Sequence, residues 1–149
     1  MHKKKQYRKD TLFIAYALLD RFLSRGKLEI LPNGVLDLVQ LGAVCLLLAA
    51  KLNQPLSPSF YQMILLMDDQ YRADPLCKKK MIDLEFNVVS QLEFDLQIQT
   101  PLIFLGRHLM YFLKNVRSSC EKKVIEHTAL QFLKFMAYKA TYLEFKPSH

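Results

Sequence analysis

The chain has 149 residues, of which 51% are hydrophobic, and it carries a formal net charge of +7. This length suits one domain, or one domain with part of another, and the composition permits a sizeable core. The longest uninterrupted apolar run, Leu41–Ala50, has ten residues. A membrane span needs roughly 20, so we expect no membrane-spanning helix there. The basic N-terminus is not followed by the apolar region and cleavage site of a secretory signal.

Much of the positive charge lies in short clusters at residues 2–5, 78–80 and 122–123. Such clusters are usually solvated faces, although they also attract acidic partners or nucleic acid, and charge alone does not separate these readings. The three cysteines are widely spaced and lack metal-ligand spacing. Their odd number and spacing favour a reducing compartment, the cytosol or the nucleus.

The first predicted helix starts at Asp10 or Thr11 and runs to about Ser24, because apolar residues recur there at helical spacing. Turn signals follow it. The next predicted helix, Val35–Asn53, is apolar on every side at its centre, so we expect other helices to surround it. Lys51 ends the apolar run, where a cation suits the negative end of the helix dipole.

Three later helices are predicted from a capping residue followed by proline, since proline at the first helical position sacrifices no hydrogen bond. The pairs and the helices they predict are Ser57-Pro58 for 58–67, Asp74-Pro75 for 75–93 and Thr100-Pro101 for 101–115. Ser118 with Glu121 has the pattern of a capping box for a helix from Glu121 to about Tyr142, and a further helix start is predicted at 146–148. No long polar–apolar alternation indicates a strand. The expected fold class is therefore all-α, a helical bundle around a central buried helix.

Catalytic chemistry finds no support in the sequence. The four glycines are isolated, so there is no glycine-rich phosphate loop, and His108 and His127 lie on different predicted helices without metal-ligand neighbours. Asp68 and Asp69 fit helix caps better than a catalytic pair. We therefore expect an interaction module that is not an enzyme, with no cofactor, metal or small-molecule ligand.

Five fragments in this order resemble the cyclin box: TLFIAYALLDRFLSR, LGAVCLLLAAK, MDDQY, LEFNVVSQLEFDL and TPLIFL. Within the family, FDL followed by TPLIFL is closer to the A/B mitotic type. The resemblance covers about residues 7–109. It implies a cyclin box over residues 7–99 that lacks its first helix, followed at 100–149 by an incomplete start of a second cyclin-like repeat. The central helix of the box corresponds to Val35–Asn53.

The family binds and activates cyclin-dependent protein kinases, so the resemblance implies such a kinase as partner, cell-cycle control as the role, and the nucleus or cytoplasm as the location. In the family, a lysine ending the third helix and a glutamate in the fifth reach backbone groups of the kinase. The matching residues are Lys51 and Glu85, and the apolar neighbours by position are Leu52, Val89 and Leu96. Without the resemblance, Glu85 would be taken as a solvated helix carboxylate.

The chain also departs from the family pattern. The family pairs the aspartate of DRFL, here Asp20, with an arginine of the first helix, and no such arginine precedes Tyr7. A buried unpaired carboxylate is costly, so we expect Asp20 to be exposed or to be served by Arg21, Lys51 or another base. Two alternatives to an activating subunit stay open. One is a transcription or nucleic-acid adaptor with the fold shared by transcription factor IIB, and the other is a cyclin relative that binds a kinase without activating it.

Overall fold

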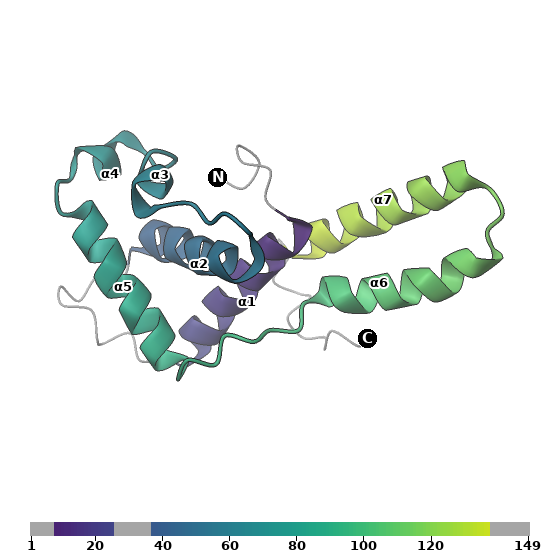
Figure 1. Ribbon diagram of the computed structural model, residues 1–149, viewed down its shortest axis with the longest axis horizontal. Coiled ribbons are helices and arrows are strands. Elements are labelled where there is room, and N and C mark those ends of the chain that lie inside the picture. Colours follow the sequence, from purple (N-terminus) through teal and green to yellow (C-terminus); the bar gives the residue numbers. More distant parts are fainter. Residues whose placement is uncertain (1–7, 26–36, 138–149) are drawn as a thin grey trace. The chain divides into compact units, whose positions relative to one another are not determined.

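The computed structural model describes residues 8–25 and 37–137 of the chain. Within these ranges every regular element is helical, which confirms the predicted all-α class (Figure 1). The elements are α1 (Lys9–Ser24), α2 (Leu38–Asn53), α3 (Phe60–Ile64), α4 (Asp69–Ala73), α5 (Cys77–Gln91), α6 (Pro101–Phe112), the short 3₁₀ helix η3 (Leu113–Asn115) and α7 (Ser119–Met136). The chain divides into two compact units, Met1–Ile98 and Gln99–His149.

Helix α2 is the centre of the first unit. Its residues Ala43–Ala50 are all buried, and α1, α3 and α5 pack against it. This follows from the sequence, because a helix that is apolar on every side must be covered on every side. The helix begins at Leu38 because the Asp37 carboxylate caps it. This carboxylate accepts hydrogen bonds from the backbone N–H groups of Val39 and Gln40. The predicted start at Val35 lies outside the described residues.

Buried polar contacts fix both ends of α2. At its C-terminal end, the buried Thr11 hydroxyl of α1 accepts hydrogen bonds from Asn53 Nδ2 at 3.2 Å and from Gln54 Nε2 at 2.7 Å. At its N-terminal end, the Tyr71 hydroxyl of α4 donates to Asp37 Oδ1 at 3.1 Å. Burial, and after it this hydrogen bond, raise the pKa of Tyr71, so the phenol stays protonated as a donor. These contacts set the register of α1 and α4 along the central helix.

Two predictions for the segment after α2 were wrong in detail. The helix predicted at 58–67 is the shorter α3, because Ser59 rather than Ser57 caps it in a capping box with Gln62. Asp68 and Asp69, which directly follow the predicted helix 58–67, start a separate helix, α4, that was not predicted. Five-residue helices carry too few periodic positions for sequence patterns to separate them.

Helix α5 is shorter at both ends than the predicted 75–93. At its start, the Asp74 carboxylate accepts from the Leu76 N–H at 2.8 Å and from Lys80 Nζ at 2.7 Å, so residues 74–76 form a capped turn before the helix. The hydrogen bond from Lys80, and after it that from Leu76, lower the pKa of Asp74.

At its C-terminal end, α5 closes in a Schellman motif. The Glu93 N–H donates to Ser90 O and the Phe94 N–H donates to Val89 O, each at 3.0 Å. Both Glu93 and Phe94 have positive φ, 56° and 60°, a conformation that usually belongs to glycine or asparagine. The sequence offers neither residue there, which is why the end of the helix was predicted two residues late.

Two arginines at the C-terminal end of α1, Arg21 in its last turn and Arg25 as its C-cap, hold this turn. Arg21 Nη2 lies 2.9 Å from Asp95 Oδ2, and Arg25 Nη1 lies 3.1 Å from Glu93 Oε1. Arg25 also donates to the carbonyl oxygen of Gln91. The turn therefore receives charge-assisted hydrogen bonds from the end of α1 on both sides of its strained residues.

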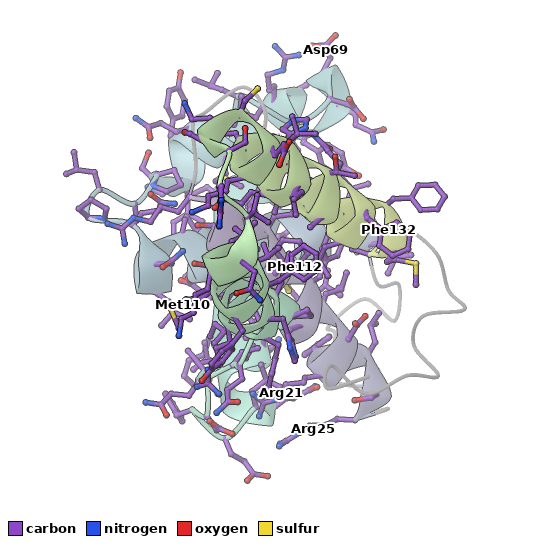
Figure 2. All side chains as sticks on the ribbon, turned by 90° about the vertical axis from the view of Figure 1, so that its right-hand side faces the viewer. Arg21, Arg25, Asp69, Met110, Phe112 and Phe132 are labelled. Atoms are coloured by element: carbon purple, nitrogen blue, oxygen red, sulfur yellow. The ribbon has the colours of Figure 1, made fainter. Side chains whose placement is uncertain are left out.

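The second unit contains α6, η3 and α7, and α6 packs against α7. As predicted, Thr100 and Pro101 start α6. Ser118 caps α7 by accepting from the Glu121 N–H at 3.4 Å. The predicted end at Tyr142 and the helix start at 146–148 lie outside the described residues. Several large apolar side chains of this unit are exposed, among them Met110, Phe112 and Phe132 (Figure 2).

Replacement of Thr11 by valine should show how much the buried hydroxyl contributes. Valine keeps the shape but removes the acceptor, which leaves the amide donors of Asn53 and Gln54 without it. We expect the free energy of unfolding to fall by about 1–3 kcal/mol, measured by urea denaturation. Thr11→Ser, which keeps the hydroxyl, is the control and should lose less. Equal stability of the valine variant and the parent would contradict this account.

The strain at Phe94 is testable by comparing two truncations. Phe94 is 71% exposed, and both Phe94→Gly and Phe94→Ala remove its ring, so their difference isolates the backbone. Because φ is positive, the glycine variant should be the more stable by about 1 kcal/mol. At Phe86, an exposed position inside α5, the same pair should show the opposite order. Urea denaturation measures both pairs, and the same order at the two positions would exclude strain.

Candidate functional site

Lys51 and Glu85 meet on the surface of the first unit. Lys51 lies in the last turn of α2, and its Nζ is 2.6 Å from Glu85 Oε1 and 2.9 Å from Glu85 Oε2. Glu85 lies in the middle of α5, which packs directly on α2. The lysine side chain is 41% exposed and the glutamate side chain 17%. The packing of two helices thus brings together the two residues that the sequence comparison singled out, 34 positions apart.

A third helix contributes an aromatic ring to this pair. The Lys51 ammonium lies 5.1 Å from the centroid of the Phe60 ring. Phe60 is the first residue of α3 and packs against the core of the unit. The sequence analysis missed this residue, because an aromatic side chain at the start of a short helix gives no signal of a contact with a distant lysine.

The site can act as both donor and acceptor towards a polypeptide backbone. An ammonium has three N–H donors and a carboxylate has about four lone-pair sites, so their mutual contact leaves capacity on both groups. Lys51 is partly exposed and Glu85 is mostly buried, so salt screens the pair only in part. The unused hydrogen-bonding capacity lies at a surface where Lys51 is accessible to a partner.

The three apolar residues assigned to the same surface differ in exposure. Leu52, next to Lys51, is 50% exposed, whereas Val89 and Leu96 are half-buried and pack against the core. Leu52 thus offers free apolar area, and the other two offer only their outer atoms. Ile82 and Phe86 of α5 are also exposed. The sequence analysis did not identify them. Ile82 lies three residues before Glu85, and Phe86 lies three residues before Val89, a spacing that places residues side by side on a helix surface.

Asp20, the aspartate of the DRFL fragment, lies at the surface of the first unit. Its side chain is exposed, and in residues 8–25 and 37–137 no ion pair includes it. Arg21 instead pairs with Asp95, and Lys51 with Glu85. The part of the Asp20 carboxyl that is shielded from water raises its pKa. Of the two alternatives expected for Asp20, exposure or a basic partner, the structure shows exposure.

Within the part of the chain that the structure describes, no three His, Cys, Asp or Glu side chains are grouped so that they could hold a metal ion. Nor is any described helix both long enough and apolar enough to cross a membrane.

Comparison with known proteins gives a consistent result. Residues 1–97 match the family described as the cyclin N-terminal domain. Cyclin-B2-1 of Oryza sativa subsp. japonica is 27% identical over 148 residues, covering 99% of this chain and 31% of the relative. G2/mitotic-specific cyclin-A of Hydra viridissima is 31% identical over 120 residues, covering 77% of this chain and 24% of the relative. Cyclin-A2-1 of Arabidopsis thaliana is 28% identical over 141 residues, covering 93% and 29%.

No solved structure matches the chain to a significant degree. The chain spans about a third of the length of the curated relatives it matches. The relatives are A-type and B-type cyclins, in agreement with the FDL and TPLIFL fragments, and the family is non-catalytic. The match to the N-terminal domain covers most of the first unit and well over half of the chain, so this protein belongs to the cyclin family.

Proposed function

We propose that this chain is a regulatory subunit that binds and activates a cyclin-dependent protein kinase in cell-cycle control. Membership of the cyclin family supports the class of partner, and the G2/mitotic-specific names of relatives support the role. The observation that carries the proposal is the ion pair of the partly exposed Lys51 with Glu85 on the packed helices α2 and α5. Such a subunit would act in the nucleus or the cytoplasm.

The polar contact would be made to the kinase backbone. The Lys51 ammonium donates to carbonyl oxygens beside the mobile αC helix of the kinase, and the Glu85 carboxylate accepts from N–H groups there. Charge-assisted hydrogen bonds are the stronger kind, and backbone partners tolerate sequence change in the kinase. Leu52, with Val89 and Leu96, supplies apolar contact beside the pair.

Activation would be allosteric. Within the kinase, catalysis requires an ion pair between the lysine of strand β3 and the glutamate of helix αC. A partner that binds the inward position of αC better than the outward one shifts the kinase population towards the active state. The cyclin supplies position only, and no catalytic group.

A charge-swapped variant tests the contact sharply. Lys51→Glu with Glu85→Lys keeps an ion pair between α2 and α5, so the free energy of unfolding should stay within about 1 kcal/mol of the parent. Towards the kinase backbone, however, donor and acceptor are exchanged. We expect at least about a tenfold loss of affinity for the kinase that co-purifies with the parent, measured by titration calorimetry, with a matching loss of kinase activation.

The control is the exposed pair Asp69 and Arg72 of α4 in the same unit, whose double alanine variant should bind like the parent. Undiminished binding by the charge-swapped variant would remove Lys51 and Glu85 from the interface. A parent that binds a kinase without raising its activity would identify a non-activating relative. If no kinase of a recombinant panel binds, a salt-dependent titration with duplex DNA tests the adaptor role instead.

A further inference from the structure

We infer that Phe60 is a positioning residue for Lys51, whose ammonium is held between the Phe60 ring and the Glu85 carboxylate before any partner arrives. This inference rests on the proposed function for its purpose, but its geometry belongs to the free chain. The three side chains come from α3, α2 and α5, so the arrangement depends on the fold and on no local sequence pattern.

The ring is itself held in place. Ser59 Oγ accepts from the Gln62 N–H at 3.3 Å, and Gln62 Oε1 accepts from the Ser59 N–H at 3.4 Å. This capping box fixes the start of α3, and Phe60 follows it directly and packs against the core. A ring fixed by a helix cap and by core packing can orient a flexible side chain, whereas a freely rotating ring cannot.

The ring and the carboxylate constrain different movements of the lysine. The hydrogen bonds of 2.6 Å and 2.9 Å to Glu85 fix the distance of the ammonium from α5, but a lysine stem with rotatable methylenes can still sweep around that point. The face of an aromatic ring attracts a cation by its quadrupole. The Phe60 ring, whose centroid lies 5.1 Å from the Lys51 ammonium, therefore restricts the rotation of the lysine stem on one side. The two hydrogen bonds to Glu85 use two of the three ammonium N–H groups, so one remains for a partner.

A second cation–π contact in the described chain differs from that of Lys51 and Phe60 in how its ring is held. Lys114 Nζ lies 5.1 Å from the centroid of Tyr111, but the two residues are neighbours within one helical turn, and Tyr111 is exposed. That contact is local, and the exposed Tyr111 ring is not held by core packing. It therefore provides an internal reference whose signals should not respond to changes at Phe60.

The competing explanation is that Phe60 only fills the core. Two substitutions separate the roles: Phe60→Leu keeps an apolar side chain without an aromatic face, and Phe60→Tyr keeps the face. In the free full-length chain, NMR with ¹³C-labelled lysine should show the Lys51 ε-methylene protons shifted upfield by the ring. The leucine variant should lose this shift, the tyrosine variant should keep it, and the Lys114 signals should stay unchanged. An unaltered Lys51 signal in a folded leucine variant would overturn the inference.

The effect on binding is measured against the kinase that the parent binds. Phe60→Leu should weaken binding about two- to fivefold and Phe60→Tyr should restore it, while in a Lys51→Ala background Phe60→Leu should have no further effect. An equal loss in that background would make Phe60 a packing residue and overturn the inference, as would full affinity of Phe60→Leu. If the parent binds no kinase, the proposed function fails. The NMR comparison still decides whether Phe60 orients Lys51.

Discussion

The burial of α2 on every side is the constraint on which the first unit depends. A helix with no polar face has no stable exposed position, so α1, α3 and α5 must all lie against it. Lys51 is the first charged residue after the apolar run, and it emerges between two of the covering helices, against Glu85 of α5 and Phe60 of α3. The position of the site is therefore a consequence of core packing. The charged groups on the surface did not need to attract one another for the helices to assemble.

Polar contacts then decide where each element starts and stops. Asp37 joins the cap of α2 to Tyr71, and Thr11 joins α1 to the residues that end α2. At the end of α5 the backbone is strained, because Glu93 and Phe94 adopt positive φ and neither is glycine. Such residues cost of order 1–3 kcal/mol each and persist only where their surroundings determine them. Arg21 and Arg25 provide such surroundings.

The sequence predicted most of the fold for reasons that can be named. The long helices α1 and α2 were found because periodicity and apolar content are strong over many residues, and α6 was found from Thr100 and Pro101. The α4 helix was missed because five residues carry too few periodic positions. The true end of α5 was missed because Glu93 and Phe94 adopt a backbone conformation that such residues rarely take. Resemblance identified Lys51 and Glu85, whereas their contact with Phe60 depends on packing between three helices, which no sequence pattern reports.

The restraint on Lys51 is compatible with a binding role. Lys51 is partly exposed and so remains accessible to a partner, although Glu85 is mostly buried. A free lysine, however, loses about 1.5–2 kcal/mol of rotamer entropy when it is ordered, and a complex that must order it at the moment of binding is weaker by that amount. In this chain the ring of Phe60 and the carboxylate of Glu85 have already taken up part of that order. Part of the rotamer entropy of Lys51 is therefore lost when the first unit folds, and it is not lost again when a partner binds.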